Sequence, residues 1–160
     1  MHHARARRMA RRKLKTAGDE RQLVEYADQE PSAFSSMLGG LIEANVKGRE
    51  EKQGDFENLV ARVGIFVTDI DEAVTLDFQG GHLLVRGGLE PGCDITIRAD
   101  ADTVMQLSNV PVGFAGMPNY LAPAGRDVVC RLLGRRLRIG GVLGNLTTLN
   151  QVTRLFSVAE

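Results

Sequence analysis

The sequence predicts an α+β domain in which two helices are followed by a five-stranded, mainly antiparallel sheet. The main observation is a change in the spacing of apolar residues, from three and four residues to two, near Val63. Short alternating runs then follow one another with turn-forming residues between them. At 160 residues, with 43% apolar and 25% charged side chains, the chain has the length and composition of one globular domain.

The N-terminus is predicted to be a disordered basic arm, residues 1–18, and residues 19–160 are predicted to form the folded domain. The first fifteen residues contain no acid and seven bases, namely Arg5, Arg7, Arg8, Arg11, Arg12, Lys13 and Lys15. The other 145 residues hold thirteen bases and twenty acids, a formal charge of −7. An organellar transit peptide is an alternative interpretation of the arm, but Ser and apolar residues are scarce in it.

Composition also bears on location. The sequence contains no run of eighteen apolar residues, and no apolar stretch follows the basic start, so neither a membrane span nor a secretory signal is predicted. The two cysteines, Cys93 and Cys130, are too few for a disulfide framework. We therefore expect a cytoplasmic protein.

Helical spacing comes first along the chain. From Pro31 onward, apolar residues recur at the interval of one helix face, at Phe34, Leu38, Leu41, Ile42 and Val46. Gly39-Gly40 in the middle of this helix indicates either close packing or a break. Phe56, Leu59 and Val60 continue the spacing after a charged stretch and predict a second short helix.

Three strands are predicted next, and their alternating apolar residues are Val63, Ile65 and Val67, then Val74, Leu76 and Phe78, then Leu83 and Val85. The connections at 68–71 and 79–81 are short and rich in turn formers, which predicts an antiparallel meander.

A fourth strand is predicted at Cys93, Ile95 and Ile97, and it leads into Asp100, a good N-cap for a helix with Val104, Met105 and Leu107. Residues 109–125 combine three prolines and three glycines with apolar side chains, so we expect a loop that covers or lines something hydrophobic.

The C-terminal part completes the pattern. Residues 127–133 predict a helical turn, and residues 136–139 alternate as a fifth strand that ends at Gly140-Gly141. A terminal amphipathic helix is predicted from Val142, Leu146, Leu149, Val152 or Thr153, and Phe156.

This order of elements resembles the sterol-carrier-protein family over about residues 34–157. Residues 93–107 are similar to the family's strand-to-helix unit, and residues 129–141 are similar to its apolar turn, glycine, basic-apolar strand and second glycine. The segment between Leu107 and Val129 is longer than in the family, and the basic arm has no counterpart in the family's minimal domain. The resemblance implies helices that cover one face of the sheet and an apolar tunnel between them, in which a lipid is bound without catalysis.

A lipid tunnel requires apolar side chains, since the binding is driven by apolar area removed from water. With the resemblance, the expected ligand-binding residues are Val104, Met105, Leu107, Phe114, Met117, Tyr120, Leu121, Val128, Leu132 and Leu133, with Leu146, Leu149 and Phe156 closing the floor. The ligand class is a sterol, a fatty acyl chain or an isoprenoid, and neither a cofactor nor a metal is expected. The alternative to a tunnel is that these residues are ordinary core.

An enzyme is the first alternative class, and the sequence shows no nucleophile-base pair. His82 is the only histidine outside the arm, and Cys93 is interpreted as a buried thiol. The acids Asp69, Asp71 and Glu72 are interpreted as a solvated turn.

Two further classes concern partners. Nucleic-acid binding is suggested by the arm and by Arg126, Arg131, Arg135, Arg136 and Arg138, but it is not expected, because the body is acidic and aromatic residues make up only 5%. The arm, residues 5–15, is an alternative contact for anionic membrane lipids. An accessory subunit that presents a lipid intermediate to partner enzymes also remains open.

Overall fold

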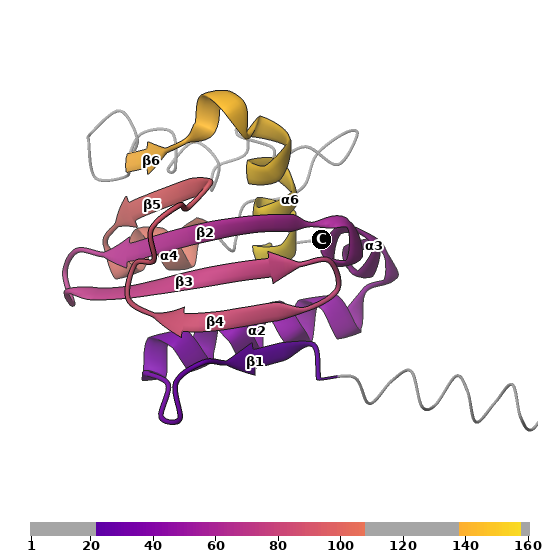
Figure 1. Ribbon diagram of the computed structural model, residues 1–160, viewed down its shortest axis with the longest axis horizontal. Coiled ribbons are helices and arrows are strands. Elements are labelled where there is room, and N and C mark those ends of the chain that lie inside the picture. Colours follow the sequence, from indigo (N-terminus) through magenta and orange to yellow (C-terminus); the bar gives the residue numbers. More distant parts are fainter. Residues whose placement is uncertain (1–21, 108–137, 158–160) are drawn as a thin grey trace, which may run out of the picture.

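The structure, a computed structural model, describes residues 22–107 and 138–157, and Figure 1 shows it facing the sheet. One mixed sheet is formed by six strands: β1 (Val24–Tyr26), β2 (Val60–Val67), β3 (Glu72–Gln79), β4 (Leu83–Gly87), β5 (Ile95–Ala99) and β6 (Arg138–Gly140). The helices are α2 (Ala33–Gly48), α3 (Glu50–Asn58), α4 (Ala101–Leu107), the short 3₁₀ turn η2 (Val142–Gly144) and α6 (Leu146–Phe156). The α+β class is confirmed.

The sheet has six strands in the order β1-β4-β3-β2-β5-β6, so the expectation of five strands is wrong. Three neighbouring pairs are antiparallel, as predicted for the meander β2-β3-β4, whereas β1 with β4 and β2 with β5 are parallel. The additional strand is β1, whose three residues are too short to show a period of two.

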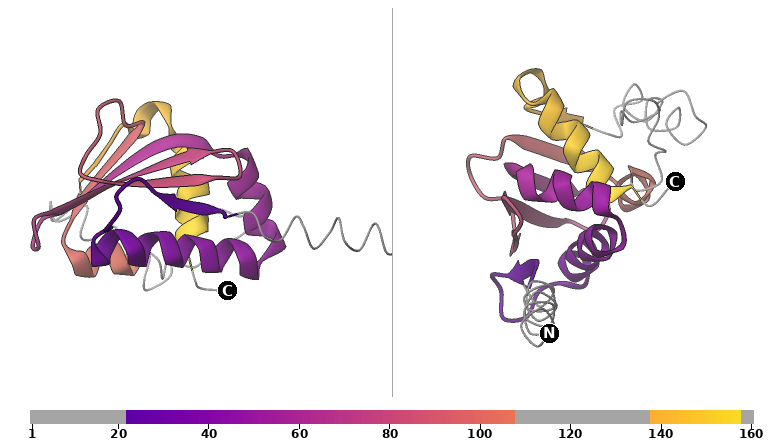
Figure 2. Two further views of the ribbon diagram at one scale, coloured as in Figure 1. Left: turned by 60° about the horizontal axis from the view of Figure 1, so that its bottom comes forward. Right: turned by 90° about the vertical axis from the view of Figure 1, so that its right-hand side faces the viewer.

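The helices α2, α3, α4 and most of α6 lie on one face of the sheet, and η2 lies at its β6 edge, as the views in Figure 2 show. Apolar side chains from this inner face and from α2 and α3 form the core, including Phe56 and Phe78, whose rings meet edge to face with centroids 6.3 Å apart. The outer face carries the alternate residues of the same strands, among them Arg62, Thr75 and Asp77.

The first helix begins at Ala33 and is capped by Ser32, whose hydroxyl accepts a hydrogen bond from the amide of Ser35 at 3.1 Å. Pro31 therefore precedes the cap instead of lying in the first turn. The helix continues through Gly39-Gly40, and the reason for Gly39 is close packing, because a Cβ there would lie 2.5 Å from the hydroxyl oxygen of Tyr26. No break occurs.

The second helix ends earlier than expected. Leu59 is its C-cap, and Val60 is already the first residue of β2, so the inclusion of both residues in the helix is wrong. Leu59 is buried and Val60 is exposed. The helical spacing of these two residues from Phe56 arises by chance, because α3 ends where β2 begins.

Later elements agree more closely with the prediction. The side chain of Asp100 accepts a hydrogen bond from the amide of Thr103 at 2.7 Å, which is the expected N-cap of α4. After β6, Gly141 has φ +82° and lies directly against the carbonyl of Asp94, so only glycine fits at this turn. The terminal helix begins at Leu146, and Val142 belongs to η2.

Three predicted segments, namely the basic arm 1–18, the apolar loop 109–125 and the helical turn 127–133, lie outside the described residues. The predicted domain boundary at residue 18 and the first two residues of the predicted fifth strand, Arg136 and Leu137, also lie outside the described residues.

Candidate functional site

The thirteen expected ligand-binding residues fall into three groups. Outside the described residues lie Phe114, Met117, Tyr120, Leu121, Val128, Leu132 and Leu133. Met105 and Leu107 belong to α4. The other four have described side chains, and these are Val104, Leu146, Leu149 and Phe156.

The apolar stripe of α6 is covered at only one end. Val152 and Phe156, in its second half, are buried, Leu149 is half-buried, and Leu146 in the first turn is 60% exposed. These residues recur at three- and four-residue intervals and therefore lie on one face of the helix. The exposure thus increases along a single apolar stripe toward the helix N-terminus.

The covered end of α6 is fixed by side chains from α2 and α3. The side-chain amide of Asn45 donates to the carbonyls of Leu155, at 2.8 Å, and Phe156, at 3.3 Å. Lys52 Nζ donates to the carbonyl of Ser157. The last carbonyls of a helix have no partner within it, so these contacts satisfy them and place a cation at the negative end of the helix dipole.

An ion pair adds to this junction, with Arg154 Nη2 2.8 Å from Asp55 Oδ1. Lys52 is almost fully buried, at 6% exposure. Burial, and to a smaller extent the charge of Arg49, lowers the pKa of Lys52 to about 8, while Asp55 opposes the shift. The C-terminal end of α6 is therefore held by a buried polar junction.

The other end of α6 stands beside the β5–β6 end of the sheet. The side-chain amide of Asn145 donates to the carbonyls of Gly141, at 3.0 Å, and Asp94, at 3.2 Å, which connects the start of α6 to β5. Ile139 in β6 is paired with Ile97 in β5, on the inner face.

Three apolar side chains at this end, Ala101, Ile139 and Leu149, pack against the core but are only partly buried. They come from α4, β6 and α6, which lie on the helix side of the sheet or at its edge (Figure 2). Val104, three residues after Ala101 in α4, is buried. We take the helix face of β5–β6, bounded by α4 and the first half of α6, as the candidate site for an apolar ligand.

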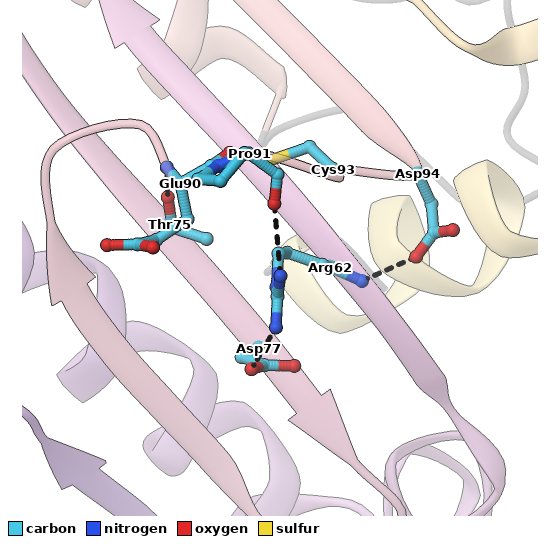
Figure 3. A network of polar contacts seen from close by, with 7 residues as sticks. All are labelled: Arg62, Thr75, Asp77, Glu90, Pro91, Cys93 and Asp94. Carbon is cyan, nitrogen blue, oxygen red and sulfur yellow. Dashed lines mark hydrogen bonds and ion pairs between the residues drawn. The ribbon is translucent and has the colours of Figure 1, made fainter.

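The outer face of the sheet is occupied by polar contacts instead, as Figure 3 shows. Arg62 in β2 donates from Nη1 to the carbonyl of Pro91, at 3.1 Å, and from Nη2 to Asp77 in β3, at 3.2 Å. Its backbone amide donates to the carboxylate of Asp94 at 2.8 Å. Arg62 thus joins two strands to the connection between β4 and β5.

Thr75 holds the other end of that connection. Its hydroxyl donates to the carbonyl of Gly88, at 2.8 Å, and accepts from the amide of Glu90, at 2.9 Å. A Cβ at Gly64 would lie 2.7 Å from Leu89 and 3.0 Å from Cys93 Sγ, so the connection rests directly on β2. Residues 88–94 therefore cover this part of the outer face.

Cys93 and His82, the two residues considered for an enzyme, have separate partners. Cys93 Sγ donates to the carbonyl of Glu90 at 3.1 Å, and burial raises the pKa of the thiol. His82 Nε2 lies 3.3 Å from Glu25 Oε2 in β1.

The acidic turn has a structural role at one position, since the carboxylate of Asp69 accepts from the amide of Ala101 at 2.9 Å. Within residues 22–107 and 138–157, no group of three or more His, Cys, Asp or Glu is arranged to hold a metal ion. In the same part of the chain, every helix is too short or too polar to cross a membrane.

Sequence reasoning missed the α2-α3-α6 junction. Lys52 lies one helical turn before the buried Phe56, which places both on the same face of α3 and is a signal that Lys52 is buried. Nothing in the sequence indicates that its acceptor is the carbonyl of Ser157.

No protein-family model matches the sequence, and no curated protein matches it significantly. Solved structures do resemble the fold. The UbiJ-SCP2 ubiquinone synthesis protein superposes with a TM-score of 0.55 at 14% identity, over 79% of this chain and 94% of its own. Sterol carrier protein 2 gives a TM-score of 0.50 at 13% identity, over 78% of this chain and 95% of its own.

A part of a larger protein is also similar. The sec-alkylsulfatase Pisa1 from Pseudomonas sp. matches with a TM-score of 0.46 at 15% identity, over 70% of this chain but only 15% of its own. The matches to the UbiJ-SCP2 protein and to sterol carrier protein 2, in contrast, extend over nearly the whole length of those two proteins. The chain therefore has the fold of sterol-carrier-protein domains, as the resemblance in sequence implies.

Proposed function

We propose that this chain binds a lipid in an apolar cavity between the helix face of the sheet and α6, and that it carries or presents the lipid without converting it. The support from the comparisons is the shared fold, since one neighbour is named for sterol carriage and another for ubiquinone synthesis. A sterol, a fatty acyl chain or an isoprenoid is the proposed ligand class.

The observation that carries the proposal is the uneven covering of α6. Its apolar stripe is packed and anchored at Phe156, only partly covered at Leu149, and exposed at Leu146. An acyl chain that covers about 300 Å² of apolar surface would gain about 7 kcal/mol before the costs of binding are subtracted, at about 25 cal/mol per Å². Such a gain is sufficient for a carrier that must also release its ligand.

The lining of the cavity is part of the proposal. Val104, Met105 and Leu107 would contribute from α4, Leu146 and Leu149 from α6, and Phe156 would close the floor. The seven expected residues between 114 and 133 remain predictions. A role without catalysis is consistent with Cys93 and His82, which have separate partners in the described residues.

Native mass spectrometry of the freshly purified full-length chain, followed by solvent extraction, tests the proposal. We expect a species heavier than the bare chain and an apolar compound in the extract. A chain that carries no adduct and also takes up no fatty acid, sterol or isoprenoid when these are added would contradict it.

An accessory role is the second candidate, and it is favoured by the neighbour named for a biosynthetic pathway. The two roles differ in one property. A free carrier moves a labelled lipid between two vesicle populations by itself, whereas an accessory subunit does so only slowly and is isolated with a stable enzyme partner.

A further inference from the structure

The connection between β6 and α6 exposes two leucines at one corner of the domain. Leu143 in η2 is fully exposed, and Leu146 at the start of α6 is 60% exposed. Both stand where the chain leaves the sheet edge, which Figure 1 shows above β5 and β6. A group of exposed apolar side chains on a surface is typical of a contact site.

Two arginines lie on the neighbouring strands. Arg98 in β5 and Arg138 in β6 are Cα partners in the antiparallel pairing, and both are exposed. Neither guanidinium has a hydrogen bond or ion pair with an acceptor in the described part of the chain; that of Arg98 lies 5.2 Å from the ring centroid of Phe66. Like charges directly opposite each other on a sheet are destabilising, so a bound anion would stabilise this pair.

The acidic and basic residues of the described chain are distributed unevenly between its two parts. Residues 22–107 hold sixteen acids and six bases, a formal charge of −10. Residues 138–157, which form β6, η2 and α6, hold two arginines and no acid. The exposed leucines therefore lie in the basic part of an otherwise acidic domain.

We propose that the β6 edge of the sheet, with Arg98 and Arg138 at the start of β6 and Leu143 and Leu146 after its other end, docks on an anionic lipid bilayer. Transfer of exposed leucines from water into the interfacial region of a bilayer lowers the free energy, and guanidinium groups bind lipid phosphates at its surface. A nucleic acid would pair with the arginines but leave the leucines in water, and so would an acidic protein surface. The bilayer is the partner that uses both kinds of side chain.

This inference goes beyond the lipid cavity, because it concerns a contact at the surface. Leu146 belongs to both proposals, so the tests change only Leu143, Arg98 and Arg138, which lie outside the proposed lining of the cavity. It also differs from a contact through the basic arm. The tests use the full-length chain, so the arm is present in every variant.

The absence of tryptophan from the chain allows a direct test. In Leu143→Trp, the single indole should shift its emission to shorter wavelength on addition of vesicles made of equal amounts of phosphatidylglycerol and phosphatidylcholine, and brominated lipid should quench it. Val60→Trp is the control, because Val60 is also an apolar, exposed residue, at 77%, and lies on another part of the sheet. The proposal fails if the emission of Leu143→Trp stays unchanged or if both indoles respond alike.

The arginines are tested by the double variant Arg98→Gln, Arg138→Gln. Its partition onto the same vesicles should be about 30-fold weaker, which corresponds to about 1 kcal/mol for each arginine. Arg86→Gln, on β4 of the same outer face, removes one charge where the double variant removes two, and its effect should lie well below the about fivefold loss expected for one arginine of the pair. Equal losses in the two variants, or binding of the wild type to single-stranded RNA in preference to the vesicles, would contradict the proposal.

Discussion

Lys52 in α3 and Ser157 after α6 are 105 residues apart in the chain, yet the ammonium group of the lysine donates to the carbonyl of the serine. Both residues are buried. The contact fixes the C-terminal end of α6 against α3, and the opposite end of the same helix is left with an exposed apolar stripe. The proposed lipid site depends on this difference between the two ends.

A buried lysine makes the stability depend on pH. The pKa of Lys52 is lowered to about 8, so between pH 8 and about 10.5 the unfolded chain binds more protons than the folded one. The contribution of Lys52 to the free energy of unfolding should therefore rise with pH in this window, by up to about 3 kcal/mol.

Urea denaturation at several pH values, with Lys52→Met beside the wild type, measures this contribution. The variant should lack the rise, whereas Lys47→Met, the same change on the exposed surface of α2, should retain it. If Lys52→Met follows the wild-type curve, the lysine is not buried as described.

Gly39 and Gly40 provide a matched pair in α2. A Cβ at Gly39 would clash with Tyr26, whereas a Cβ at Gly40 would meet nothing within 4 Å. Gly39→Ala should therefore destabilise the chain by about 1–3 kcal/mol, and Gly40→Ala should stabilise it by up to about 1 kcal/mol.

Thermal denaturation of both variants decides this, and a double-mutant cycle with Tyr26→Ala identifies the cause. The cost of Gly39→Ala should become smaller when the tyrosine is absent. Equal costs with and without Tyr26 would mean that β1 does not lie against α2 as the structure shows.

Thr75 holds residues 88–94 on the outer face through its hydroxyl. Thr75→Val keeps the shape of the side chain but leaves the partly buried carbonyl of Gly88 and amide of Glu90 without their partner, which costs about 1 kcal/mol. The segment should then open more often, and Cys93 should be alkylated faster by iodoacetamide.

The rate at Cys93 is followed by peptide mass spectrometry in a Cys130→Ser background. Thr96→Val, on the same face of β5, is the control, and it should label at the parent rate. An unchanged rate in Thr75→Val would show that the hydroxyl does not hold the segment.

Local signals account for what the sequence predicts correctly. The meander β2-β3-β4 follows from alternation of apolar residues with short turns, and the N-cap of α4 follows from Asp100 alone, because both depend on neighbouring residues. The strand β1 has only three residues, and its parallel pairing with β4 joins distant segments, so no local pattern predicts it.

The candidate site shows the same limit. The sequence predicts the apolar stripe of α6, but not that Phe156 is packed while Leu146 is exposed, because the period of a helix does not say which turns are covered. Likewise, Arg98 and Arg138 become neighbours only through the pairing of β5 with β6.

The most direct test of the account is a titration of the delipidated, full-length chain with cis-parinaric acid, whose fluorescence rises in an apolar cavity. We predict saturable binding of the wild type and a loss of affinity of about tenfold or more, equivalent to about 1.4 kcal/mol, in Leu149→Asp. Val60→Asp should bind like the wild type, and thermal denaturation should show that each variant is folded. If Leu149→Asp is unfolded, Leu146→Asp, at an exposed position of the same stripe, replaces it. A wild type that does not bind the probe, or folded variants at Leu149 and Leu146 that bind it with unchanged affinity, would contradict the proposed lipid site.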